Sequence, residues 1–131
     1  MSAEDVENIR KGLEAFNRRD VEAVMETCHP DAEFVPVRAV FEGISYHGEE
    51  GLRQFFADMD EEWNDMRTEL DELRDADGTV IVLGRFHATG KASGIEVDWP
   101  AAWVCEMRDG KTARLQAYTD QQEALRVAGL A

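Results

Sequence analysis

The chain has 131 residues, of which 44% are hydrophobic and 32% are charged, as in an ordinary globular domain. A formal net charge of −14 repels phosphate backbones and anionic lipid surfaces, so we expect neither nucleic acid nor membrane as a partner. No apolar run approaches the roughly 20 residues that cross a bilayer, and the N-terminus lacks a signal-peptide core. These features predict one cytoplasmic domain over residues 1–131.

Three helices are predicted in the N-terminal half. Ser2 and an apolar stripe with spacings of three and four predict a first helix that ends near Asn17. Asp20 caps a shorter second helix, which ends before Pro30. The longest helix is expected over residues 49–65. Its apolar face comprises Leu52, Phe55, Phe56, Met59 and Trp63.

Strands are expected in the rest of the chain. A loose alternation predicts a strand over 32–40, where Pro36 indicates an edge or a bulge. Residues 67–74 suit either a helix or an exposed strand, and the turn that follows favours a strand. The next strand is expected over 79–90.

The C-terminal third predicts a hairpin. A strand is expected over 95–108 and another over 112–119, joined by the turn Arg108-Asp109-Gly110; an Asp-Gly pair between two such runs is typical of a tight hairpin. Asp120 then caps a last short helix. Helices followed by antiparallel strands indicate an α+β domain with helices on one face of a curved sheet.

Four strings in this chain resemble a known family. They are AFNRRDVEAVMETCHPDAEF, YHGEEGLRQFF, RDGKTARLQAYTD and EALRVAGL. With the element order and length, they resemble the SnoaL-like branch of the nuclear transport factor two-like superfamily, which includes the ketosteroid isomerases. The resemblance implies a cone-shaped, strongly curved mixed or antiparallel sheet around a long helix, with two N-terminal helices and a short C-terminal helix. It also implies an apolar pocket at one end and often a homodimer through the outer sheet face.

The catalytic groups of the ketosteroid isomerases and of the SnoaL-type cyclases have no counterparts here. The resemblance places Gly12 where the isomerases carry a tyrosine, Pro36 or Val35 at their general base, and Trp103 at their protonated aspartate. The acid–base aspartate of the SnoaL-type cyclases falls on Ala117, and their histidine again on Trp103. None of these side chains can move a proton at neutral pH. Isomerase and cyclase chemistry of the known kinds is therefore not expected.

Apolar side chains should line the pocket instead. If Trp103 faces inward, period-two alternation puts Trp99 on the same face, and Ala117 faces them from the last strand. In a cone-shaped fold the core and the pocket wall are one surface. The predicted ligand-binding residues are Phe16, Phe34, Phe55, Met59, Trp63, Trp99, Trp103 and Ala117.

Arg85 and His87 are the candidate catalytic residues. They share one face of their strand, and a regular turn through 90–94 would bring them near Trp99 and Val97. In that arrangement Arg85 anchors a carboxylate or enolate, and His87 acts as an acid or base near neutral pH. The alternative puts both on the outer face, paired with the abundant acids.

No cofactor and no metal are expected. The three histidines are far apart in the sequence, and none forms a pair with the spacing of helical metal ligands. Cys28 and Cys105 lie in apolar contexts, which favours buried free thiols.

Two functions therefore remain open. One is a domain that binds a small hydrophobic, cyclic molecule, with any turnover resting on cofactor-free acid–base chemistry at His87 and Arg85. The other is a non-catalytic structural or interaction dimer whose pocket is filled by its own side chains, with Trp103 as the plug. A cavity above about 300 Å³ with a convergent polar group would favour binding.

Overall fold

The computed structural model describes residues 2–37 and 42–130. The elements in chain order are α1 (Ala3–Asn17), α2 (Val21–Glu26), β1 (Cys28–Val35), β2 (Tyr46–His47), α4 (Gly48–Glu62), β3 (Trp63–Ala76), β4 (Thr79–Gly90), β5 (Glu96–Arg108), β6 (Lys111–Tyr118) and α5 (Gln121–Val127). The six strands form one sheet in the order β2-β1-β6-β5-β4-β3. β1 and β6 run parallel, and every other neighbouring pair is antiparallel.

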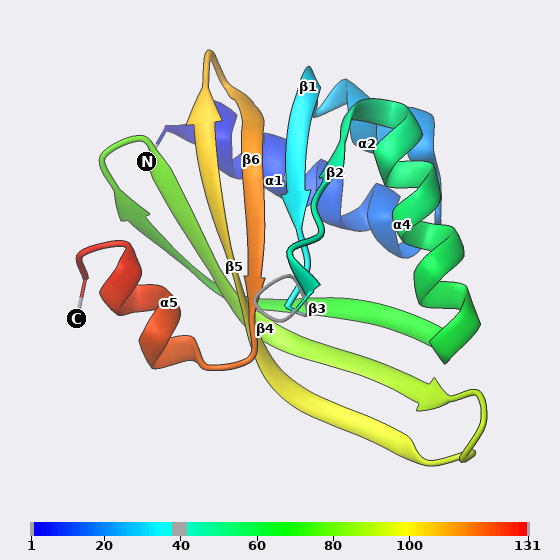
Figure 1. Ribbon diagram of the computed structural model, residues 1–131. Helices are drawn as coiled ribbons and strands as arrows, with labels where there is room; N and C mark the ends of the chain where they lie inside the picture. Colours follow the sequence, from blue (N-terminus) through cyan, green and yellow to red (C-terminus); the bar gives the residue numbers. More distant parts are fainter. Residues whose placement is uncertain (1, 38–41, 131) are drawn as a thin grey trace.

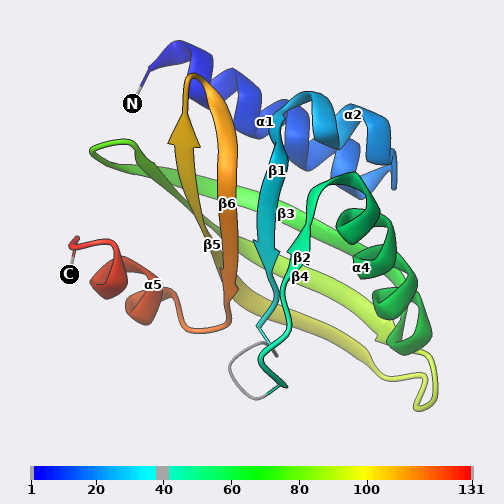
Figure 2. The same cartoon turned by 45° about the horizontal axis from the view of Figure 1, so that its top comes forward.

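The sheet is strongly curved and has helices on both faces. Figure 1 shows α1, α2 and α4 together on one side and α5 on the other. The view in Figure 2 shows α1 lying across the strands and α4 beside the ends of β3 and β4. The α+β class and the curved mixed sheet predicted from the sequence are confirmed. The expectation that the helices lie on one face is wrong for α5, whose Leu125 packs on the opposite face.

The predicted caps and tight turns form as expected. The side chain of Ser2 accepts a hydrogen bond from the Asp5 N–H, and Asp20 and Asp120 cap α2 and α5 in the same way. Asp109 and Gly110 both have positive φ angles of 55° and 76°, which a type I′ hairpin turn requires. The Asp-Gly pair at 77–78 makes the same turn between β3 and β4.

Several predicted boundaries are wrong. β1 begins at Cys28, so that cysteine lies in a strand and not on the inward face of the second helix. Residues 38–40 of the predicted strand lie outside the described residues. The long helix ends at Glu62, and Trp63 has extended φ and ψ angles of −130° and 143° at the start of β3. Trp63 lies four residues after Met59, which is the spacing of one helix face, and this explains why the sequence predicted it in the helix. In the structure it is the first residue of β3.

The structure settles one open prediction and adds one strand. The ambiguous residues 67–74 belong to β3, a strand of 14 residues. Residues 46–47, which lie between the predicted strand over 32–40 and the long helix, form β2, which pairs Tyr46 with Phe34 of β1. Both strands lie at sheet edges, where pairing on one side only weakens the local sequence signal.

The two faces of the sheet have separate cores. Even-numbered residues of β4 such as Val82 face α1, whereas Ile81 and Leu83 face α5 and pack against its buried Leu125. The side chain of Gln121 ties α5 to the sheet by donating to the carbonyl oxygens of Gly84 and Ala101, at 3.1 and 3.0 Å. None of the helices within the described residues is long and apolar enough to cross a membrane.

Candidate functional site

Two adjoining cavities lie between the helices and the concave face of the sheet. The inner cavity holds about 120 Å³ and is walled mainly by α1, β1 and β6; the outer cavity holds about 330 Å³ and reaches the surface beside Val37 and Trp99. Six residues line both: Phe16, Pro36, Phe55, Thr68, Trp103 and Ala117. The shared wall makes the two cavities compartments of one site.

Aromatic rings surround the outer cavity. Trp63 packs edge-on against Phe86 and Trp99, with ring centroids 5.5 and 5.8 Å apart, and Phe86 stacks on Trp99 at 6.0 Å. On the helix side, Phe16 and Phe55 meet at 6.0 Å. All three tryptophans of the chain therefore line this compartment.

The inner cavity contains both thiols. Cys28 and Cys105 line it and are buried. Desolvation by burial raises the pKa of Cys28, and it raises the pKa of Cys105 to about 12. Both thiols are therefore protonated at neutral pH, and a protonated thiol is a weak nucleophile.

The predicted ligand-binding residues all lie on these walls. They are Phe16, Phe34, Phe55, Met59, Trp63, Trp99, Trp103 and Ala117. The inner cavity is also lined by the positions that match catalytic residues of the ketosteroid isomerases, among them Gly12, Val35 and Pro36. The wall is thus in the expected place, and the role of these residues as ligand contacts stays a prediction.

Arg85 and His87 lie outside the cavities, and their prediction as the polar end of the pocket is corrected. The register of β4 with β5 pairs Arg85 with Pro100 and His87 with Asp98, whereas Phe86 pairs with Trp99. The regular turn assumed from the sequence differs from this register by one residue. A one-residue change in register moves every side chain to the opposite face of a sheet, so Arg85 and His87 share the outer face.

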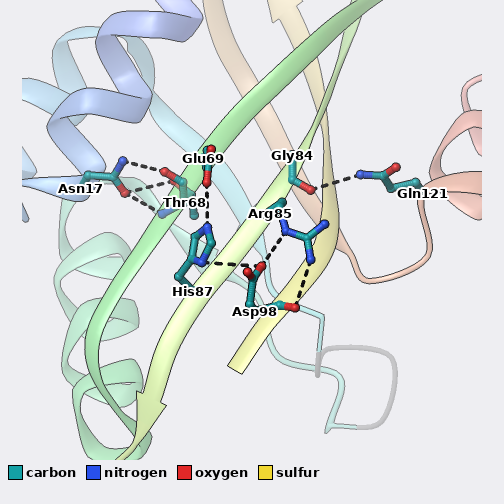
Figure 3. Close-up of polar contacts among 8 residues, drawn as sticks. All are labelled: Asn17, Thr68, Glu69, Gly84, Arg85, His87, Asp98 and Gln121. Carbon is teal, nitrogen blue, oxygen red and sulfur yellow. Dashed lines mark hydrogen bonds and ion pairs between the residues drawn. The ribbon is translucent and has the colours of Figure 1, made fainter. Parts of the chain in front are cut away.

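The outer face holds these two residues in a charged network (Figure 3). Arg85 donates from Nε to Asp98 at 2.6 Å, and His87 Nε2 lies 2.7 Å from a Glu69 carboxylate oxygen. His87 Nδ1 is also 3.6 Å from Asp98. The hydrogen bond from Arg85 lowers the pKa of Asp98. This is the arrangement expected of paired surface charges.

Thr68 and Asn17 form a polar contact at the cavity wall that the sequence did not reveal. Thr68 of β3 is buried, lines both cavities and pairs across the sheet with Phe86. Asn17, at the end of α1, makes three hydrogen bonds to it (Figure 3). The sequence gives no reason to single out Thr68 until residues 63–76 are known to form a strand. In a strand, alternation from the buried Met66 then places Thr68 on the inward face.

Phe86 was also missed as a lining residue. It was assigned to the face opposite Arg85 and His87, and the one-residue register change brings that face to the cavity. Within the described residues, no three His, Cys, Asp or Glu side chains gather closely enough to hold a metal ion.

Comparison with known proteins places the chain in a family. Residues 9–115 match the SnoaL-like domain, so the chain belongs to the SnoaL-like domain family. An NTF2-like protein from Burkholderia thailandensis is 27% identical, with a TM-score of 0.77 over 99% of this chain and 98% of that one. No curated protein matches the chain.

Two further solved structures share the fold. TerC, co-crystallised with polyporic acid, is 23% identical, with a TM-score of 0.81 over 97% of this chain and 99% of that one. An NTF2-like protein of unknown function from Burkholderia pseudomallei is 22% identical, with a TM-score of 0.80 over 97% and 98% of the two chains.

Proposed function

We propose that this protein binds a small, apolar, cyclic molecule in the two-compartment cavity. The observation that carries the proposal is the outer cavity of about 330 Å³, with aromatic walls and an opening to the surface. Ligand sites are typically concave, mostly apolar and at least about 300 Å³ in volume. A flat ring would contact Trp63, Phe86 and Trp99 at little entropic cost, because those rings already pack against one another.

The wall favours binding over acid–base catalysis. Among the described lining residues, Glu62 is the sole carboxylate, and no lysine, arginine or histidine contributes. Arg85 and His87 are on the other side of the sheet. TerC was crystallised with polyporic acid, which supports a cyclic ligand for the fold.

The alternative of a cavity filled by its own side chains has less support. Trp103 contributes to the walls of both compartments, and both compartments remain open beside it. A plugged cone would have no second compartment of ligand size. The exposed position of Arg85 fits that alternative, but it fits an apolar binding site equally well.

Intrinsic fluorescence tests the proposal directly, because every tryptophan lines the outer cavity. A panel of neutral cyclic compounds should quench or shift the emission and raise the melting temperature. Ala117→Phe would fill space at the shared wall and should abolish both effects. Val127→Phe is the matched control, since Val127 is 61% exposed on α5. A library without hits, or equal binding by both variants, would argue against the proposal.

We also propose that two copies associate through the outer face of the sheet, and that the protein is cytoplasmic. What supports the dimer is that the outer face beside α5 carries charges of both signs, Arg85 and Asp98 among them, which a second copy of the same face can complement. Sedimentation should give twice the monomer mass. A monomer at all concentrations would refute the association.

A further inference from the structure

The polar groups of the cavity wall indicate which ligands it accepts. The buried polar residues of the described chain are Thr27, Thr68 and Thr112, and all three line the inner cavity. They come from the end of α2, from β3 and from β6. A buried hydroxyl without a partner costs free energy, so the position of each proton follows from its hydrogen bond.

At Thr68 the proton is fixed by Asn17. The Asn17 amide nitrogen donates to the Thr68 carbonyl at 2.9 Å, and the Thr68 N–H donates to Asn17 Oδ1 at 2.8 Å. Reversing the amide would bring donor against donor and acceptor against acceptor. Oδ1 can only accept, so the Thr68 hydroxyl, 3.1 Å away, must donate its one proton to it. Its lone pairs remain for a group inside the cavity.

The other two hydroxyls also donate to the protein. Thr27 Oγ1 donates to the Val24 carbonyl at 2.7 Å, and Thr112 Oγ1 donates to the Met107 sulfur at 3.7 Å. The thiol of Cys28 lies 3.7 Å from Thr27 Oγ1 and can donate to it. Each threonine therefore presents oxygen lone pairs, and no hydroxyl proton, to the inner cavity.

Charge adds a second condition. The described residues of the inner wall include no lysine, arginine or histidine to neutralise an anion. Asn8, the one amide among them, carries no charge and donates one of its two N–H groups to the Thr27 carbonyl at 2.8 Å. With a chain charge of −14, an anionic group would lose its hydration and gain no counter-charge.

From this we infer that the ligand is a neutral cyclic compound carrying a hydroxyl or N–H group, and that this group donates to Thr68 Oγ1. The inference rests on the proposed binding function and narrows it to alcohols, phenols and related neutral donors. Carboxylates and enolates are rejected. Thr68 lies at the shared wall, so the ring occupies the outer compartment while its polar substituent points inward. The indole N–H groups of the outer cavity remain available to a second, accepting substituent.

Four compounds on one bicyclic skeleton test it: indane, indan-5-ol, 5-methoxyindane and indane-5-carboxylate. Their affinities are measured by isothermal titration calorimetry. One hydrogen bond should make indan-5-ol bind about 3- to 10-fold tighter than 5-methoxyindane, which lacks the donor. The carboxylate should bind at least about 10-fold more weakly than the alcohol.

Two variants attribute the preference to one oxygen. Thr68→Val keeps the shape and removes the acceptor, so the alcohol and the ether should bind within about twofold of each other. Thr68→Ser restores the hydroxyl and should restore the preference, which also controls for folding. A preference that survives Thr68→Val, or a carboxylate that binds as well as the alcohol, would overturn the inference. If indane binds and the alcohol gains nothing, only the inference fails; if none of the four binds, the proposed function fails with it.

Discussion

Replacing Asn17 by alanine should destabilise the protein more than any other polar truncation on α1. Asn17 joins the end of α1 to β3 by three hydrogen bonds of 2.8 to 3.1 Å with Thr68. Because β3 is an edge strand, no further strand can satisfy the Thr68 N–H and carbonyl. At a net 0.5–1.5 kcal/mol for each bond, the free energy of unfolding should fall by about 2–4 kcal/mol.

Asn8→Ala is the matched control. Asn8 also lies on α1 and makes one hydrogen bond, 2.8 Å long, to the Thr27 carbonyl, so its loss should cost about 1 kcal/mol. Asn8 lies in the interior of α1 and Asn17 at its last residue, so the gain in helix propensity is at most about 0.7 kcal/mol in either variant and stays below the expected difference. Urea unfolding followed by circular dichroism gives the two free energies by linear extrapolation. If Asn17→Ala costs no more than Asn8→Ala, the contact with Thr68 does not hold α1 to the sheet.

Four other outcomes follow from the structure. Gly84→Ala should destabilise by about 1–3 kcal/mol or more in urea unfolding, because its Cβ would lie 1.8 Å from the Glu69 carbonyl oxygen; an unchanged midpoint would contradict the close strand approach. Stability should fall as the pH rises from about 9 to about 12, by up to about 4 kcal/mol, because the unfolded Cys105 thiol ionises near 9.0 and the folded one near 12. The fall should be smaller in Cys105→Ala, and equal slopes would refute the assignment. His87→Ala should leave ligand affinity within about twofold, whereas a large loss would place it back in the site. A ketosteroid isomerisation assay should detect no turnover, and any rate abolished by Trp103→Ala would contradict the argument from missing carboxylates.

The sequence predicted the wall of the site better than its polar groups. Apolar residues such as Phe16 and Trp103 could be found because burial in a curved fold leaves a periodic pattern, and the pattern points to the concave side. Thr68 could not be found this way. A single threonine is common on either face of a strand, and its importance comes from Asn17, a residue 51 positions away.

The sequence by itself determined the helix caps and the tight turns, which depend on only a few neighbouring residues. Ser2, Asp20 and Asp120 cap helices because a side-chain oxygen can reach the next free N–H groups. The Asp-Gly pairs at 77–78 and 109–110 set the register of their hairpins, since two residues with positive φ leave one geometry for the turn.

The tertiary structure alone decided which face of β4 forms the site. The turn between β4 and β5 is longer, with Thr89 pairing with Glu96, and its sequence allows either register. The observed register is the one that packs Phe86 against Trp99 on the helix side and leaves Arg85 and His87 outside. Packing two aromatic rings together is favourable, and burying two unpaired charges is costly. This difference in free energy between the two registers exists only once the helices pack on the sheet. It decides that the apolar face of β4 lines the cavity and that the charged face lies behind it.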